Sequence, residues 1–258
     1  MVQPIAIVVA MQSELTHLIP EHIASSDVRS DIWTETHVSI GNLPIIAVRS
    51  GIGMVAAAAA SQHLLSQHDP QVMLNFGCTG SHVREQYPGD VVIGAASIAH
   101  APVRIDAVGN EIFTSGGFGV GEDAEADHIF PSGSGLVLLA QSIAETWQPD
   151  PWPVGSPPRL PGVRTGNVGS GDVWNQHLAR LDALHARYGT LCEDMEAAAI
   201  AQVAAMHDVP FLTIKDISNN EYHDVTDFDE HGAGILEAEL GKRAATLIWR
   251  ILESLAKF

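Results

Sequence analysis

Short, β-branched apolar segments alternate along this chain with segments of helical character, and this alternation constrains the fold more than any other feature of the sequence. Continuous apolar runs of about four to eight residues are typical of strands that are buried on both faces. Strands of this kind that alternate with helices predict an α/β fold with a largely parallel or mixed sheet covered on both sides. The runs that predict strands are Ile5–Ala10, Leu43–Val48, Val72–Phe76, Asp90–Ile93 and Pro210–Ile214.

Segments with helical character separate or follow these runs. The segment after residue 53 is rich in alanine and carries few charges, which predicts a buried helix. The last segment places leucine and isoleucine at helical spacing, which predicts an amphipathic helix. The predicted helices are Met11–Leu18, Met54–Gln67, Leu136–Trp147, Gln176–Arg187, Met195–His207 and Leu236–Leu255.

Prolines crowd residues 148–162, at positions 149, 151, 153, 157, 158 and 161. No helix or central strand tolerates that density of proline. Because the alternation of strands and helices resumes afterwards, we interpret this segment as a surface excursion and not as a linker between domains. We therefore expect one domain that spans residues 1–258, a length that suits an α/β fold.

The charge balance of the chain argues against some classes of partner. Its 258 residues include 31 acidic and 13 basic side chains, a net charge of −18, whereas nucleic acids and anionic membranes bind basic surfaces. Hydrophobic residues make up 46% of the chain, which is enough for a full core. The two cysteines form no disulfide framework, no apolar run is long enough to span a membrane, and the start lacks a signal peptide's basic region. We expect a soluble cytoplasmic protein.

Polar and glycine-rich segments follow the predicted strands. This placement matters because ligands of open α/β sheets bind at the carboxyl ends of the strands. Glu14 follows the first strand and Ser218-Asn219 follows the last, while Ser50–Gly53 and Gly77–Gly80 follow two others. The backbone N–H groups of Gly77–Gly80 suit an oxygen-rich ligand, although a plain tight turn explains the segment equally well. Neither glycine-rich segment is a P-loop or a dinucleotide fingerprint.

Three carboxylates, Glu193, Asp194 and Glu196, stand at the start of an alanine-rich predicted helix. Negative charge is favourable at a helix N-terminus, and this explains Glu193 and Asp194. Glu196 leads directly into the buried stretch Ala197–Ile200, where a carboxylate needs a partner or a function. A pair of ligand hydroxyl groups, such as a ribose diol, would satisfy it.

Other residues with chemical potential give weaker signals. The chain has 13 histidines but no H-E-x-x-H motif and no paired C-x-x-C, so we expect no metal site and no cofactor. No pairing of Cys78 with a histidine is evident, which argues against a nucleophilic cysteine. Trp174 follows the glycine-rich stretch Gly169–Gly171, where it is either a core residue or a face on which a planar base stacks.

Taken together, these segments resemble the nucleoside phosphorylase superfamily, and most closely its hydrolase branch, the methylthioadenosine/S-adenosylhomocysteine nucleosidases. The resemblance covers nearly the whole chain, and the order and spacing of the motifs make it specific. It implies a single three-layer α/β domain with a mixed, partly closed central sheet flanked by helices, and it implies a homodimer. The motifs are IAIVVAMQSE (Ile5–Glu14), SGIGMVAA (Ser50–Ala57), NFGCTG (Asn75–Gly80), GDVVI (Gly89–Ile93), SGDVW (Ser170–Trp174), DMEA (Asp194–Ala197) and PFLTIKDISN (Pro210–Asn219), with Phe228-Asp229-Glu230 beyond.

The resemblance also implies roles for individual residues. Glu14 falls where the nucleosidases have the glutamate that activates the attacking water, and Glu196 falls where a carboxylate accepts from the sugar hydroxyls. Cleavage of an N-glycosidic bond passes through an oxocarbenium-like sugar, which a nearby carboxylate stabilises. A general base is needed for the water, and a donor is needed at N7 of the departing purine. The implied substrate-binding residues are Met11, Cys78, Thr79, Gly80, Trp174, Met195 and Phe228.

The choice between hydrolysis and phosphorolysis depends on positive charge for phosphate. Phosphorylases of this superfamily place an arginine just before the turn at Gly77–Gly80 and another in the loop after the first strand. Here the first position is Asn75, and the loop Ala10–Glu14 holds no arginine. Phosphate would meet little positive charge, so we predict water as the acceptor. Arg49 is the nearby basic residue that would alter this prediction.

One position departs from the nucleosidase pattern. These enzymes have an aspartate after Ile-Ser that protonates N7, whereas this chain has Asn219, whose amide donates a hydrogen bond but transfers no proton. Superfamily members that act on 6-oxopurines similarly carry asparagine there. The sequence therefore predicts a purine nucleosidase with Glu14, Glu196 and Asn219 as catalytic residues, and leaves open adenine substrates such as methylthioadenosine or S-adenosylhomocysteine, and 6-oxopurine substrates such as futalosine or inosine. A 6-oxopurine phosphorylase and a non-catalytic purine-binding relative remain the alternatives.

Overall fold

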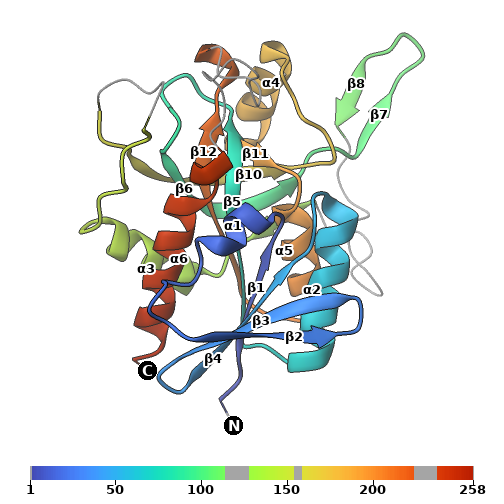
Figure 1. Ribbon diagram of the computed structural model, residues 1–258. Coiled ribbons are helices and arrows are strands. Elements are labelled where there is room, and N and C mark those ends of the chain that lie inside the picture. Colours follow the sequence, from blue (N-terminus) through green and yellow to red (C-terminus); the bar gives the residue numbers. More distant parts are fainter. Residues whose placement is uncertain (1, 114–127, 154–158, 224–236, 258) are drawn as a thin grey trace.

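The computed structural model describes residues 2–113, 128–153, 159–223 and 237–257. Ten strands of these described ranges form one sheet in the order β11-β10-β6-β12-β5-β1-β4-β3-β2, with β9 paired to β6 (Figure 1). A separate hairpin, β7-β8, projects from the body of the molecule. The strands are β1 (Ile5–Val9), β2 (Ser25–Ser30), β3 (Trp33–Ile40), β4 (Leu43–Arg49), β5 (Val72–Ser81), β6 (Val91–Ala99), β7 (Val103–Ile105), β8 (Glu111–Phe113), β9 (Ile129–Pro131), β10 (Val163–Ser170), β11 (Thr190–Asp194) and β12 (Phe211–Asn219).

The sheet is mixed and partly closed, which confirms the predicted fold class. Strand β1 lies parallel to β4 and β5, and β12 lies parallel to β5. In contrast, β12 and β6 are antiparallel, as are the outer pairs β2-β3 and β3-β4. The far end of β5 pairs again with β11, where Ser81 lies opposite Cys192. This last pairing curls the sheet back upon itself at its carboxyl ends.

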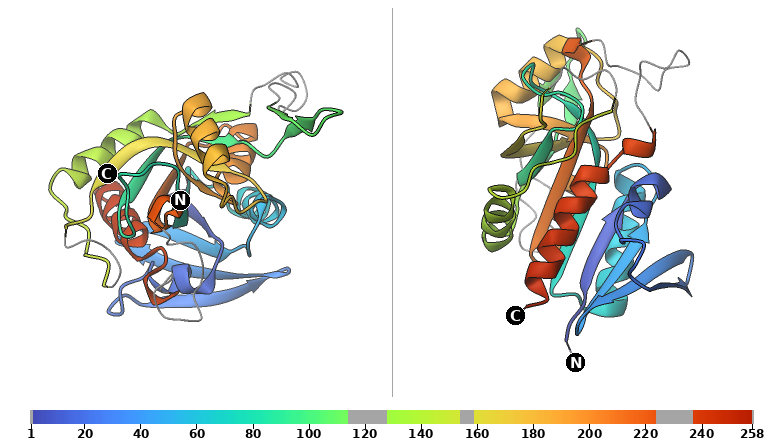
Figure 2. Two further views of the ribbon diagram at one scale, coloured as in Figure 1. Left: turned by 90° about the horizontal axis from the view of Figure 1, so that it is seen from above. Right: turned by 60° about the vertical axis from the view of Figure 1, so that its left-hand side comes forward.

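Helices cover the sheet on both faces (Figure 2). Helices α3 and α6 pack with the core on one face, and α2 and α5 pack with the core on the other. Within the described residues, no helix combines the length and apolar character needed to cross a membrane. The helices are α1 (Gln12–Thr16), α2 (Met54–His68), α3 (Ser134–Ala144), α4 (Leu178–Tyr188), α5 (Ala197–Met206) and α6 (Lys242–Leu255), with short 3-10 turns η2 (Glu221–His223) and η3 (Glu237–Glu239).

The segment Gly77–Gly80 is part of a strand, so it is not the tight turn that was one of its two interpretations. Strand β5 continues to Ser81 because β12 pairs with it along this segment and β11 joins it at the end. Position 77 requires glycine for a steric reason, because a Cβ there would lie 2.4 Å from Oε1 of Glu14. Glycine therefore lets the catalytic candidate lie directly against the strand.

The C-terminal helix begins later than its apolar spacing predicts. Helix α6 starts at Lys242, because Gly241 has a φ of 71°, a left-handed conformation that ends regular helix. A Cβ at Gly241 would also lie 3.0 Å from Cγ of Glu14. Both the backbone conformation and the close approach to Glu14 require glycine at this position.

The hairpin of β2 and β3 gave no apolar signal, and the sequence did not predict it. All of β2 except its last residue is exposed. On β3, the buried carboxylate of Glu35 faces three histidine Nε2 atoms, at 2.7 Å from His37, 2.8 Å from His63 and 3.0 Å from His68. Burial alone would raise the pKa of Glu35, but these hydrogen bonds hold it at about 2. Through His63 and His68, the cluster ties β3 to α2 with hydrogen bonds to a buried carboxylate.

The described parts of the proline-rich segment contain no helix or strand and are fastened by Arg243 of α6. The guanidinium is buried and donates to the carbonyl oxygens of Asp150 (2.6 Å) and Pro151 (2.9 Å). It also lies 4.9 Å from the ring centre of the buried Trp152. Burial raises the pKa of the neighbouring Asp216 to about 7, and Arg243 opposes that rise. One cation therefore supports both a buried carboxylate and a loop without regular structure.

We predict that Arg243→Met lowers the free energy of unfolding by about 3–5 kcal/mol, because it leaves a buried carboxylate and two carbonyl groups without their cation. Arg250→Met is the matched control, since Arg250 is exposed on the same helix and its loss is expected to cost less than about 0.5 kcal/mol. Urea unfolding followed by circular dichroism measures both. Equal unfolding midpoints for the two variants would contradict this role of Arg243.

Candidate active site

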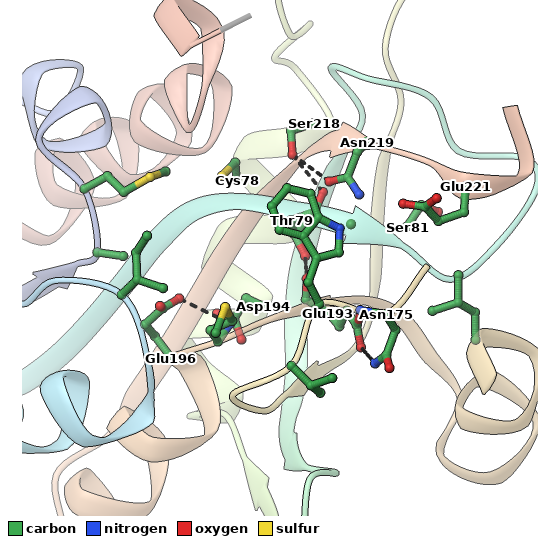
Figure 3. Close-up of a pocket in the computed structure, with 18 of the residues that line it drawn as sticks. Cys78, Thr79, Ser81, Asn175, Glu193, Asp194, Glu196, Ser218, Asn219 and Glu221 are labelled. Carbon is green, nitrogen blue, oxygen red and sulfur yellow. Dashed lines mark hydrogen bonds between the residues drawn. The ribbon is translucent and has the colours of Figure 1, made fainter. Parts of the chain in front are cut away.

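A pocket opens at the carboxyl ends of β1, β5, β11 and β12 (Figure 3). The structure brings together every site residue expected from the sequence that lies within the described ranges, and Phe228 lies outside them. These residues come from positions as distant in the sequence as Met11 and Asn219. Those that line the pocket are Met11, Glu14, Cys78, Thr79, Gly80, Trp174, Met195, Glu196 and Asn219.

Glu14 lies at the inner wall of the pocket, on the first turn of the short helix α1. Its Oε2 accepts from the backbone N–H groups of Met11 (3.0 Å) and Ala10 (3.2 Å). Its Oε1 accepts from the backbone N–H of Cys78 (2.9 Å). These three donors fix the carboxylate between the ends of β1 and β5.

Burial raises the pKa of Glu14 above its ordinary value. The positive charge of Lys215 and the backbone donors oppose this rise but do not cancel it. A carboxylate with a raised pKa is a stronger base than glutamate in water. Cys78, beside it, has a thiol pKa that is raised well above its usual range by burial and by the charge of Glu14, which disfavours the thiolate form that a nucleophile needs.

Glu196 faces the pocket from the residue that precedes α5. Its Oε1 accepts from the backbone N–H of Gly53 (2.8 Å), which links it to the start of α2. Burial and the nearby charge of Asp194 raise the pKa of Glu196. Glu196 is therefore a buried carboxylate with capacity to accept from ligand hydroxyl groups.

Asp194 and Lys215 form a buried ion pair beneath the pocket, with Oδ2 2.7 Å from Nζ. Burial lowers the pKa of Lys215, but the carboxylates of Asp194, Glu196 and Glu14 outweigh burial and raise it above its ordinary value. Asp194 also accepts from the backbone N–H of Ala197 (3.0 Å), as expected for a carboxylate at a helix N-terminus. The ammonium group thus compensates three carboxylates without entering the pocket lining.

Asn219 occupies the opposite wall, at the end of β12. The pairing of β12 with β5 shifts between Ile217 and Asn219, so that Ser218 is an extra residue in the strand. Such a bulge turns the following side chain to a new direction. The Ser218 hydroxyl donates to Oδ1 of Asn219 (3.0 Å), and Nδ2 lies over Gly80 in the pocket (Figure 3).

Three further lining residues, Glu193, Asn175 and Glu221, were not expected from the sequence. Glu193 was interpreted as a helix-terminus charge, but it lies on β11 and accepts from the backbone N–H (3.1 Å) and Nδ2 (2.6 Å) of Asn175. The Nε2 atoms of His82 and His100 lie 3.3 and 3.2 Å from its Oε2. Burial raises its pKa, but these histidines outweigh burial and lower it to about 2.

Trp174 lies at the mouth of the pocket and is 49% exposed, which excludes a core role for it. Its indole gives the pocket a flat apolar face of the kind on which a planar ring stacks. Ile52 lies at the mouth as well and is also exposed. The pocket therefore combines an apolar mouth with acidic and amide groups inside.

Among the described residues that line the pocket, none is lysine, arginine or histidine. Asn75, at the position where a phosphate-binding arginine would stand, instead donates to the Val8 carbonyl (2.9 Å) and accepts from Thr213 (2.7 Å) between strands. Arg49 is exposed in a separate groove. Across the described part of the chain, no group of histidine, cysteine or carboxylate side chains is arranged to hold a metal ion.

Solved structures resemble this fold over nearly its whole length. The 5'-methylthioadenosine/S-adenosylhomocysteine nucleosidase of Helicobacter pylori with butyl-thio-DADMe-Immucillin-A matches with a TM-score of 0.76 and 21% identity, over 98% of this chain and 99% of that one. The native futalosine hydrolase of Helicobacter pylori strain 26695 matches with a TM-score of 0.73 and 20% identity, over 99% of this chain and 98% of that one. At these identities the likeness shows a shared fold.

Sequence comparison identifies the family of the chain as well as its fold. A 5'-methylthioadenosine/S-adenosylhomocysteine nucleosidase of Shewanella baltica is 31% identical over 258 residues, 97% of each chain. The family profile described as Phosphorylase superfamily matches residues 4–253. Because that match spans almost the whole chain and includes every described residue discussed for the pocket, this chain belongs to the phosphorylase superfamily.

Proposed function

We propose that this protein is a purine nucleosidase, which hydrolyses the N-glycosidic bond between a purine base and ribose or a 5'-substituted ribose. The observation that carries the proposal is the arrangement of Glu14, Glu196 and Asn219 around one pocket that has no cation in its described lining. Hydrolysis of this bond needs a general base, a carboxylate near the sugar and a hydrogen-bond donor at N7, and Glu14, Glu196 and Asn219 match these three needs. The nucleosidase of Shewanella baltica and the hydrolase of Helicobacter pylori support the same class of reaction.

The reaction assigns one task to each of the three groups. As the bond from C1' to the purine nitrogen breaks, the sugar becomes oxocarbenium-like, and Glu196 stabilises its positive charge and accepts from its hydroxyl groups. Glu14 takes a proton from water while the water oxygen bonds to C1'. The electrons of the broken bond pass to the base, which Asn219 stabilises by a hydrogen bond to N7, and the released base takes its proton from solvent while Glu14 returns to solvent the proton that it took from water.

The electrostatics of the pocket favour water over phosphate as the acceptor. Phosphate carries up to two negative charges at neutral pH and is bound in proteins by arginine, lysine or backbone donors. In this pocket it would approach Glu14 and Glu196, and Lys215 is held beneath the lining by Asp194. The negative charges of Glu14 and Glu196 would repel phosphate, whereas neutral water meets no such repulsion.

We also propose that the protein acts as a homodimer in the cytoplasm. The dimer is supported by exposed apolar side chains near the pocket mouth, since Ile52, Val55, Trp174 and Leu178 are between 37% and 80% exposed. A second subunit on this surface would cover both the apolar groups and the mouth. The cytoplasm is supported by Cys78 and Cys192, which are both free.

We predict that purified protein releases free base from at least one purine nucleoside in phosphate-free buffer. A suitable panel contains methylthioadenosine, S-adenosylhomocysteine, adenosine, inosine, guanosine and futalosine, with the base detected by chromatography. Added phosphate is expected to leave the rate unchanged and to yield free ribose, not ribose 1-phosphate. Base release that depends on phosphate would replace the proposed hydrolase with a phosphorylase.

We predict that Glu14→Gln reduces kcat by about 100- to 10,000-fold, because the amide cannot take the proton of water. Binding of free base, measured by calorimetry, is expected to stay within a few-fold of the wild type. Glu21→Gln, at an exposed site shortly after α1, is the control and keeps full activity. Loss of binding together with turnover would point to a structural role for Glu14 instead.

We predict that kcat/KM falls with decreasing pH through a midpoint above 4.5. Glu14 acts as a base only when ionised, and burial raises its folded-state pKa above the ordinary 4.5, so protonation and loss of activity occur at higher pH than for an exposed glutamate. Initial rates measured between pH 4 and 8 with a single nucleoside test this. A rate that stays constant down to pH 4.5 would exclude Glu14 as the base.

A further inference from the structure

Strand β2 forms one end of the sheet and presents an open edge. Among the described residues only β3 pairs with it, and Figure 2 shows this hairpin at the margin of the molecule in both views. An open edge is a template for another strand, and proteins commonly block it with lysine, proline, a bulge or a covering segment. The segment Ser25–Ser30 (SSDVRS) contains neither lysine nor proline, and it pairs with β3 without a bulge. This edge is therefore open to a further strand.

The geometry of the hairpin determines which backbone groups point outward. Two residues connect β2 to β3, and the first of them, Asp31, has a φ of 56°. In a two-residue hairpin the closing pair, here Ser30 and Trp33, exchanges both of its backbone hydrogen bonds. The direction of the backbone groups alternates along a strand. The even-numbered residues of β2 therefore face β3, and the odd-numbered ones, which include Asp27 and Arg29, direct their N–H and C=O groups outward.

The side chains of Asp27 and Arg29 make this edge complementary to itself. Both are exposed, and no ion pair joins Arg29 to another described residue. When a second β2 strand pairs antiparallel with the first and the register is centred on Val28, each Asp27 lies directly opposite an Arg29. A register centred on Asp27 or on Arg29 would instead place like charges opposite each other, which is unfavourable. The charges thus favour one register.

Val28 lies on the twofold axis of that pairing. Its side chain points to the face of the sheet opposite to Asp27 and Arg29 and is 43% exposed. On the axis the two valines form a non-hydrogen-bonded pair with Cα atoms about 4.5 Å apart, so each covers apolar surface of the other. The same register places the outward backbone groups of Asp27 and Arg29 in hydrogen-bonded pairs. Backbone, charged and apolar groups therefore agree on a single arrangement.

We infer that the outer edge of β2 is an interface with a second copy of this chain, in which two β2 strands pair antiparallel about Val28 and join two sheets into one. The interface is isologous, since the same surface serves both copies. It is separate from the homodimer proposed at the pocket mouth, whose exposed apolar groups lie on α2, on α4 and in the connections before them. With both interfaces present, the assembly is larger than a dimer.

The first test changes the charges of the edge. Asp27→Arg sets arginine opposite arginine, so wild-type protein is expected to have at least about twice the mass in solution of this variant, measured by light scattering during size-exclusion chromatography. Arg29→Asp is expected to lower the mass in the same way. Glu85→Arg is the matched control, because it makes the same change of charge at an exposed site between β5 and β6, and it should keep the wild-type mass.

Complementation separates the interface from damage to a single hairpin. An equimolar mixture of Asp27→Arg and Arg29→Asp should regain the wild-type mass, because pairs between unlike copies again join opposite charges. The double variant Asp27→Arg, Arg29→Asp should regain it too, although it lacks the hydrogen bond from Thr36 to Asp27 (2.8 Å). Equal masses for wild type and Asp27→Arg would overturn the inference, as would a mixture that keeps the mass of the single variants. Failure of the pocket-mouth dimer would lower the mass of every protein in this series alike.

A cysteine cross-link tests the register. Val28→Cys should form an intermolecular disulfide under mild oxidation, because Cα atoms about 4.5 Å apart are within reach of a disulfide. Ser26→Cys, also exposed and on the same face, is the control. In this register it lies opposite Ser30 of the second copy, and its own counterpart is more than about 13 Å away, which is too far for the bond. Cross-linking of Ser26→Cys as fast as that of Val28→Cys would overturn the pairing about Val28.

Discussion

The buried ammonium group of Lys215 is the charge on which the pocket depends. It forms an ion pair with Asp194 at 2.7 Å and lies within the electrostatic reach of Glu14 and Glu196. Without a cation beneath the lining, burial would favour the neutral form of these carboxylates, and a neutral acid neither accepts the proton of water nor stabilises a positive sugar. Because the cation is placed behind the lining, the surface that meets the ligand stays acidic.

Close approach of backbone to side chain gives this charge arrangement its geometry. A Cβ at Gly77 would collide with Glu14 and one at Gly241 would crowd it, and the backbone N–H groups of Ala10 and Met11, just before α1, donate to the same carboxylate. The bulge at Ser218 directs Asn219 into the pocket from the opposite side. Glu14 and Asn219 are thus placed by backbone features at the ends of separate strands.

The parts of this molecule that could be predicted from the sequence share one physical property, which is a strong local pattern. The apolar runs gave β1 and β4, and the alanine-rich segment gave α2, nearly to the residue. The exposed strand β2 has no such pattern, and the segment Gly77–Gly80 continues as strand only because distant strands pair with it.

The same distinction applies to the candidate site. Glu14, Glu196 and Asn219 were identified because the motifs around them resemble a known family. Asn175 was missed because its place in the lining depends on its hydrogen bonds to Glu193 of β11, and Glu221 was missed because it lies outside the motifs that carry the resemblance. The consecutive polar residues Asn219, Asn220 and Glu221 directly after a buried strand were the available signal.

The place of β12 in the sheet has a consequence for synthesis of the protein. This strand, Phe211–Asn219, lies between β5 and β6, which precede it by more than a hundred residues. A chain that emerges from the ribosome with its N-terminus first has both flanking strands long before the strand that separates them. The middle of the sheet must therefore wait for a segment that is made more than a hundred residues later, and contacts of such long sequence separation form slowly. Until then the edges of β5 and β6 are open, and this interval is when a nascent chain is most exposed to aggregation.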